Sequence, residues 1–249
     1  MLINTMRTEI ITKLKEEYQK LDFSNNDIPC LTNNDYLKDD NAKYMKMYDW
    51  MSFVYDFIET VGGKIMYGNQ VNKMRQEMMN KLEWKNNISV LYVSIGTGKD
   101  LDYIPKNIDI NNLTFCGIDI SLGMLKKCKR KFNRKINLSL FKCCAEDLPF
   151  QDNSFDIVFH VGGINFFTDK QKAINEMIRV AKKNTKLLIA DETNDLIEKQ
   201  YKKRSFTSKY YDNKKIDLAE IENLIPSSTK ERNTDILWNG KFYCITFRK

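Results

Sequence analysis

The chain has 249 residues, of which 42% are hydrophobic and 12% aromatic, enough for a sizeable core in one large domain or in one domain with a helical extension. Its net charge of +7 is too small to argue by itself for a nucleic-acid partner. No stretch has the roughly 18 apolar residues of a membrane span. The amphipathic N-terminus also lacks the apolar block of a secretory signal.

Six cysteines and a single histidine, His160, argue against a metal site of the zinc-finger type, because no two cysteines form a C-x-x-C pair. Cys116 and Cys244 lie in apolar, strand-like runs, where a reduced cysteine is an ordinary core residue. We therefore expect a cytoplasmic protein without a bound metal.

The first 85 residues have the hydrophobic spacing of helices and precede every predicted strand. Residues 1–22 place apolar side chains on one face, residues 44–58 repeat them three and four apart, and residues 71–82 do the same. We expect a helical segment over residues 1–85, followed by a second unit over residues 86–249.

After Lys85 the pattern changes to short apolar runs that alternate with helical stretches. Ser121 and Asp169 each precede a helical stretch and are plausible N-caps. Runs that are apolar on both faces predict a parallel sheet covered by helices on both sides, an α/β fold. The five runs are residues 88–95, 113–119, 136–142, 155–161 and 185–191.

The chain ends in a different pattern. Asn239 and Gly240 separate the two strand-like runs KERNTDILW and KFYCITFRK. Asn-Gly between two strands indicates a hairpin, because both residues readily adopt positive φ. The predicted parallel sheet therefore finishes in an antiparallel hairpin.

The loop after the first predicted strand has the character of a nucleotide-binding loop. Gly96 and Gly98 allow close approach of a ligand to the backbone, but Leu101 stands where a dinucleotide fingerprint has its third glycine. Asp119 ends the second strand, where a carboxylate can accept hydrogen bonds from ribose hydroxyls. The alternatives are that the loop is only a tight turn and that Asp119 caps the next helix, although Ser121 is better placed for that.

A ligand with a ribose and a small anionic group, but without a pyrophosphate loop, fits S-adenosylmethionine. The chain resembles the class I S-adenosylmethionine-dependent methyltransferases in four blocks: VLYVSIGTGKDL, GIDISLGML, AEDLPFQDNSFDIVFHVGGINFF and EMIRVAKKNTKLLIAD. It most resembles the small-molecule branch typified by the ubiquinone and menaquinone C-methyltransferases. The resemblance extends from about Tyr44 to the C-terminus. It implies a doubly wound, Rossmann-like sheet of seven strands with an N-terminal helical lid.

The resemblance also implies which residues bind the cofactor. The glycine loop would wrap its methionine and ribose, and Asp119 would hold the ribose hydroxyls. His160 would lie close to the sulfonium. The implied contacts are Ser94, Gly96, Thr97, Gly98, Asp119, Ile120, Met124, Cys144, Ala145, Glu146 and His160.

Three residues depart from the family pattern. The family usually has an acid where Tyr92 stands, a glycine where Ser94 stands and an aspartate where Cys144 stands. The missing acid leaves the ammonium of the cofactor to other partners, such as the backbone carbonyls near Ser94 and His160. Cysteine is also a poor acceptor for the adenine amino group.

We expect direct displacement of the methyl group toward a small, apolar or aromatic acceptor, with alignment as the main task of the enzyme. His160, the single imidazole, is the candidate base, and the alternative is a structural histidine on the pocket floor. Tyr48, Asp49 and Tyr55 on the second helix are the other candidates for the base, and Tyr48 and Tyr55 are also candidate substrate contacts. The alternative is that the Met- and aromatic-rich face of this helix is only packing core.

Two other functions stay open. The basic runs at residues 126–135 and 199–204 suggest an RNA-modifying methyltransferase, although such runs are usually solvated faces. GGINFF, residues 162–167, also lacks the Asn/Asp-Pro-Pro-aromatic loop of many base methyltransferases. The second alternative is a non-catalytic cofactor-binding partner subunit. We expect a monomer or homodimer that binds no nucleic acid.

Overall fold

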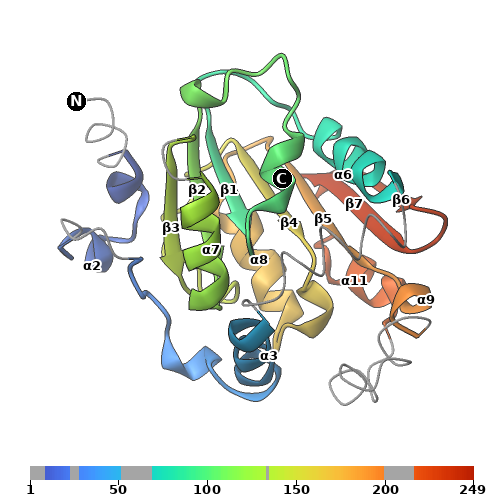
Figure 1. Cartoon of the computed structure of the whole chain (residues 1–249), viewed down its shortest axis with the longest axis horizontal. Coiled ribbons are helices and arrows are strands. Elements are labelled where there is room, and N and C mark those ends of the chain that lie inside the picture. Colours follow the sequence, from blue (N-terminus) through green and yellow to red (C-terminus); the bar gives the residue numbers. More distant parts are fainter. Residues whose placement is uncertain (1–8, 23–27, 52–68, 133–134, 199–215) are drawn as a thin grey trace.

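A computed structural model of the chain describes residues 9–22, 28–51, 69–132, 135–198 and 216–249 (Figure 1). Its centre is a seven-stranded sheet in the order β3-β2-β1-β4-β5-β7-β6. The pairs among β1 to β5 are parallel, and β7 is antiparallel to both of its neighbours. The prediction of a doubly wound α/β sheet with a C-terminal antiparallel hairpin is confirmed. The strands are β1 Ser89–Val93, β2 Thr114–Asp119, β3 Leu138–Lys142, β4 Ile157–Val161, β5 Lys186–Glu192, β6 Lys230–Leu237 and β7 Phe242–Arg248.

Helices flank the sheet, and both predicted caps form. Ser121 Oγ accepts a hydrogen bond from the N–H of Met124 at 3.2 Å, and Asp169 Oδ1 accepts one from the N–H of Lys172 at 2.9 Å. In the described ranges, no helix is long and apolar enough to cross a membrane. The α-helices are α2 Glu16–Gln19, α3 Asp39–Met51, α6 Gln70–Asn80, α7 Leu122–Phe132, α8 Lys170–Val180, α9 Asn194–Leu196 and α11 Leu218–Leu224, and the 3-10 helices are η1 Asn34–Tyr36, η3 Lys99–Tyr103, η4 Ile110–Asn112 and η5 Ile164–Phe166.

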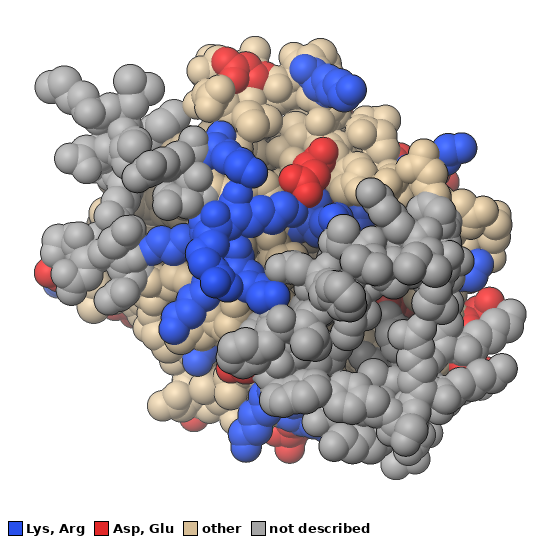
Figure 2. Space-filling model, in the orientation of Figure 1, with Lys and Arg blue, Asp and Glu red and all other residues tan. Residues whose placement is uncertain are grey.

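Most of the basic run at residues 126–135 lies on α7. Met124, Leu125, Cys128 and Phe132 are buried on one face of the helix. Lys126 and Arg130 lie on the exposed face, and Lys and Arg gather over this helix in Figure 2. The helix is therefore amphipathic, with its apolar face against the sheet.

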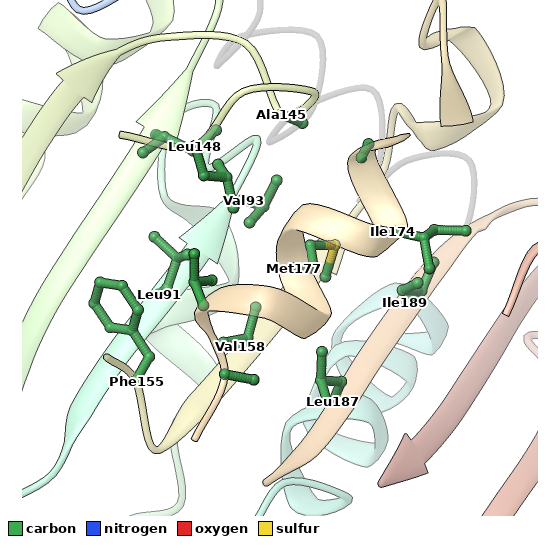
Figure 3. Packing of buried hydrophobic residues seen from close by; sticks show 14 of the residues in the cluster. Leu91, Val93, Ala145, Leu148, Phe155, Val158, Ile174, Met177, Leu187 and Ile189 are labelled. Carbon is green, nitrogen blue, oxygen red and sulfur yellow. The ribbon is translucent and has the colours of Figure 1, made fainter. Parts of the chain in front are cut away.

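Successive residues of the central strands feed two different cores, because side chains alternate across a sheet. Leu91 and Val93 belong to a buried cluster with Ile174 and Met177 of α8, seen in Figure 3. The neighbouring strand residues Val90 and Tyr92 belong to a second cluster, with side chains of α6 and α7. Both faces of the sheet are therefore covered, as the apolar runs predict.

The N-terminal residues do not form the single helix predicted over residues 1–22. In the described part, the helix breaks at Leu14, which forms a bridge with Phe150, and α2 begins only after Lys15. The backbone N–H of Lys15 donates to the carbonyl of Pro149 at 2.9 Å instead of continuing a helix. Burial of Ile10 and Leu14 against the sheet holds the chain in this broken path.

The glycine loop is followed by a short 3-10 helix, η3, and not by the α-helix that usually follows a nucleotide-binding loop. η3 has five residues, and Ile104 leaves the helical region just before Pro105. Proline disfavours the helical conformation of its predecessor, so no α-helix begins at Gly98. The loop is therefore not followed by an α-helix N-terminus that could bind an anion.

Candidate functional site

A pocket of about 220 Å³ lies at the carboxyl ends of β1, β2, β4 and β5. The strand order reverses between β1 and β4, and this switch point is where open α/β sheets bind ligands. α3 contributes Asn41, Tyr44 and Tyr48 to the pocket, so part of the N-terminal segment does contact the site. Nine of the eleven residues predicted to bind the cofactor line this pocket, and the two that do not are Gly98 and His160.

Asp119 joins the ends of β1 and β2. Its Oδ2 accepts a hydrogen bond from the N–H of Gly96 at 2.8 Å, and its Oδ1 accepts one from the N–H of Ser121 at 2.8 Å. Burial raises the pKa of Asp119 to about 6, and these backbone hydrogen bonds partly offset the effect. Each carboxylate oxygen has further acceptor capacity, so the buried side chain can still receive ribose hydroxyls.

The two loop glycines have different tasks. A Cβ built at Gly96 meets no atom within 4 Å, so this part of the backbone faces the open space of the pocket. A Cβ at Gly98 would lie 2.6 Å from Phe132 Cε2 and 2.8 Å from Cys128 Sγ. Gly96 therefore leaves room for a ligand, whereas Gly98 leaves room for α7.

Ser94 adopts a backbone conformation that normally belongs to glycine. Its φ is +57°, in the left-handed region that costs a residue with a Cβ about 1 kcal/mol or more. This explains in physical terms why the family usually has glycine here. The strained backbone is preserved with a serine, and Ser94 still lines the pocket.

The segment after β3 lies along the pocket as the resemblance implies, but one side chain is engaged elsewhere. Cys144, Ala145 and Glu146 all line the pocket, together with Ile120 and Met124. Glu146 Oε1 accepts a hydrogen bond from Asn41 Nδ2 of α3 at 2.8 Å. Burial raises the pKa of Glu146. This carboxylate therefore fastens α3 to the edge of the site.

His160 is fully buried at the end of β4, and both ring nitrogens meet the backbone. Nδ1 lies 3.1 Å from the carbonyl oxygen of Val93, and Nε2 accepts from the N–H of Ile164 at 3.0 Å. This pattern requires the neutral tautomer with the proton on Nδ1. Burial lowers the pKa of His160 to about 4. The geometry favours the structural alternative over the predicted base.

Aromatic side chains surround the part of the pocket next to α3. Tyr44 and Phe166 have ring centroids 4.7 Å apart, and Tyr48 also lines the pocket. Phe167 and Phe242 line other parts of the same pocket. Tyr55, the other predicted substrate contact, lies outside the described residues.

Sequence reasoning missed five charged residues of the pocket: Arg75, Lys99, Asp100, Asp191 and Glu192. Asp191, at the end of β5, accepts hydrogen bonds from the N–H groups of Gly163 and Asn165, each at 3.0 Å. Burial raises the pKa of Asp191 to about 6. Its place at the end of a parallel strand was a signal that could have marked it, as it marked Asp119.

Part of the chain, including the glycine loop and Asp119, is similar to known proteins. Residues 91–189 match the family model described as a methyltransferase domain. The chain is 28% identical over 159 residues to the ubiquinone/menaquinone biosynthesis C-methyltransferase of Geotalea daltonii, covering 62% of this chain and 65% of that protein. It is 32% identical over 146 residues to the demethylmenaquinone methyltransferase of Renibacterium salmoninarum, covering 58% of this chain and 56% of that protein.

The fold is also similar to that of solved methyltransferase structures. A crystal structure of an S-adenosylmethionine-dependent methyltransferase from Aquifex aeolicus matches 75% of this chain and 95% of that chain, with a TM-score of 0.58 and 18% identity. At this identity the match shows the fold alone. The chain spans less than two thirds of the length of the two curated relatives, so their full activities are not transferred with the domain.

Proposed function

We propose that the chain uses S-adenosylmethionine to methylate a small, apolar or aromatic molecule, because residues 91–189 match a methyltransferase-domain model and the sheet has a Rossmann-like fold. The observation that carries this proposal is the placement of Asp119. It lies in the pocket at the end of β2 and is fastened to the glycine loop through the N–H of Gly96. A carboxylate beside open loop backbone is the chemistry that a ribose requires.

The pocket has a suitable place for each remaining part of the adenosine. Met124 and Ile120 offer apolar surface beside Asp119, and the backbone of Cys144 and Ala145 borders the same end. The thiol of Cys144 contributes little as an acceptor, and burial raises its pKa to about 12, so it stays protonated. We assign recognition of the adenine amino group to backbone atoms of this segment.

The aromatic side chains of the pocket support an apolar acceptor. Tyr44, Tyr48, Phe166 and Phe242 line the pocket. Tyr44 contacts Phe166 in the turn after β4, and Phe242 is paired with Glu192 at the end of β5. One curated relative is named a ubiquinone/menaquinone biosynthesis C-methyltransferase and the other a demethylmenaquinone methyltransferase. We propose a hydroquinone ring as the acceptor, because this reduced ring is electron-rich enough to attack the methyl group and would stack against these side chains.

The cofactor supplies a methyl group already activated on sulfonium. The residues of the chain align the acceptor with it and exclude water, the two contributions that direct displacement needs most. His160 holds the turn after β4 and takes no proton, since both of its ring nitrogens are hydrogen-bonded to backbone. Asp191 and Glu192 are the pocket carboxylates positioned to accept a proton from an acceptor hydroxyl.

An RNA substrate receives no support from the face that suggested it. The exposed side of α7 is basic, but Phe132, its aromatic residue, is only 6% exposed and packs inward. Lys131 is paired with Asp102 at 2.7 Å. Single-stranded RNA sites combine basic groups with exposed aromatic platforms. The second basic run, residues 199–204, lies outside the described residues.

The cytoplasmic location and the monomeric or homodimeric state stay predictions.

Binding and transfer can be tested separately. We expect S-adenosylhomocysteine to raise the midpoint of thermal unfolding, and Asp119→Ala to weaken its binding at least tenfold. Methyl transfer is then measured with labelled cofactor against a panel of hydroquinones and against total RNA. Absence of binding at millimolar S-adenosylhomocysteine would sink the proposal. Transfer to RNA but to no hydroquinone would replace the acceptor class.

A further inference from the structure

A buried ion pair lies in the pocket where the family pattern is broken. Asp100 Oδ1 accepts a hydrogen bond from Arg75 Nη1 at 2.6 Å, and Asp100 Oδ2 accepts one from the hydroxyl of Tyr92 at 2.5 Å. The side chains of Arg75 and Asp100 are 14% and 2% exposed, and all three residues line the pocket. Two charges held out of water are costly, so their position in a ligand pocket needs an explanation.

The sheet order places this pair at one end of the pocket. Met124 and Cys144 follow β2 and β3, Asp119 ends β2, and the sheet then continues to β1 and β4. Tyr92 lies on β1 and stacks on Phe159 of β4, with ring centroids 4.2 Å apart. A cofactor with its adenine at β3 and its ribose on Asp119 would therefore direct its amino-acid chain toward the ion pair.

We infer that Arg75 and Asp100 bind the amino-acid end of the cofactor, Arg75 its α-carboxylate and Asp100 its α-ammonium. This inference rests on the proposed function. The amino-acid end is a zwitterion, and a site with one cation and one anion complements it without leaving net charge buried. Guanidinium is suited to a carboxylate because its planar donors match the two oxygens.

Tyr92 then has a positioning task. The family acid is absent from this strand position, but the hydroxyl of Tyr92 holds a carboxylate that lies eight residues later in the chain. In this chain Asp100 of η3 supplies the carboxylate that the family has on the first strand, and the hydroxyl of Tyr92 orients this carboxylate. Gln76 of α6 bonds the carbonyl of Tyr103 at 3.0 Å and helps to keep η3 against α6.

The test compares two ligands by calorimetric titration. S-adenosylhomocysteine contains the amino-acid end, and 5′-methylthioadenosine shares the adenosine and thioether but lacks it. The variants are Arg75→Lys, Tyr92→Phe and the double variant Arg75→Met/Asp100→Asn, which removes both charges together so that neither is left buried alone. Asp119→Asn is the matched control, because both ligands carry the ribose. Circular dichroism confirms the fold of each variant.

We expect the double variant to lose at least tenfold in affinity for S-adenosylhomocysteine and less than twofold for 5′-methylthioadenosine. Arg75→Lys and Tyr92→Phe should show smaller losses with the same selectivity, whereas Asp119→Asn should weaken both ligands alike. Equal losses for the two ligands in the double variant, or no loss, would overturn the inference while the proposed function stands. If the wild-type protein binds neither ligand, both the inference and the proposed function fail.

Discussion

Burial moves the pKa of His160 out of the range in which a free imidazole titrates. Its imidazole links β1 to the turn after β4, through the carbonyl of Val93 and the N–H of Ile164. A protonated ring would have no acceptor on Nε2, so the folded protein resists protonation. Burial accordingly lowers the pKa of His160 to about 4, from 6.5 in the unfolded chain.

Because of this pKa difference, His160 makes the free energy of unfolding depend on pH, and His160→Asn should remove that contribution. The folded pKa lies below the unfolded one, so the contribution of His160 is complete above about pH 6.5 and is lost as the pH falls toward 4. Between pH 8 and pH 5 the advantage of wild type over the variant should shrink by about 2 kcal/mol. Urea unfolding of both proteins at each pH measures it, and the subtraction cancels the opposite effects of Asp119 and Asp191.

Enzymatic turnover provides an independent check on the same variant. With cofactor saturating, His160→Asn should keep the pH profile of methyl transfer. Disappearance of an acid limb between pH 5 and 7 would instead identify His160 as a base, against the structural assignment.

At the scale of elements, the glycine loop packs so closely against α7 that there is no room for a methyl group at Gly98. Gly98→Ala places a Cβ against Phe132 and Cys128 and also strains a φ of +75°. We expect a loss of about 2–4 kcal/mol in the free energy of unfolding, measured by urea denaturation.

Gly96→Ala is the matched control for this element. Its φ of +54° carries a similar strain, but the new methyl group meets no protein atom within 4 Å. It should cost only about 1 kcal/mol of stability and reduce affinity for S-adenosylhomocysteine, because it occupies pocket space. Equal destabilisation by the two substitutions would show that packing against α7 is not the reason for Gly98.

α3 is fastened to the rim of the site by Asn41 and by Asp49, whose Oδ1 accepts hydrogen bonds from Ser121 Oγ at 2.6 Å and from the N–H of Gly123 at 2.9 Å. Asn41 Nδ2 donates to Glu146 Oε1 at 2.8 Å and to the carbonyl of Tyr36 at 3.0 Å, and Asn41 Oδ1 accepts from the N–H of Thr168 at 3.3 Å. Asn41→Ala leaves the buried carboxylate of Glu146 without this donor, at a cost of about 1–3 kcal/mol.

We expect this cost to appear as faster amide hydrogen exchange in α3 and as weaker binding of S-adenosylhomocysteine. Lys46→Ala, at an exposed position of the same helix, controls for loss of helix stability. Faster exchange across the sheet as well as α3 would show a global effect and contradict the role of Asn41 as a local fastening.

At the scale of the whole molecule, the sequence was most informative where a local pattern and a buried strand coincide. The alternation of apolar runs predicts five parallel strands, and Asn239-Gly240 predicts the hairpin, whose turn has positive φ at Trp238, Asn239 and Gly240. Asp119 could be placed in the site because a strand end is a fixed position in the fold. Its neighbours in the pocket follow from the same geometry.

Contacts between distant segments could not be read in this way. Arg75 and Asp100 belong to α6 and η3, and only the packing of these elements brings them together. The pairing of Leu14 with Phe150 likewise overrides a good helical pattern. His160 could be located on its strand, but the bonds of its two nitrogens depend on the turn that follows. Such features depend on tertiary structure, which periodicity does not encode.

The division of the chain at residue 85 leads to the last prediction, which concerns the cooperativity of unfolding. Ile10 and Leu14 share a buried cluster with the α8 side of the sheet, and Met74 and Met78 share the other cluster with Tyr92. Because the described parts of residues 1–85 contribute to both cores, they should not unfold separately. We expect one calorimetric transition with equal van't Hoff and calorimetric enthalpies, coincident in far- and near-ultraviolet circular dichroism. S-adenosylhomocysteine at 100 times its dissociation constant should raise the free energy of unfolding by about 2.7 kcal/mol and move the whole transition to higher temperature. A separate early transition that the ligand leaves unmoved would show instead that the N-terminal segment is an independent unit.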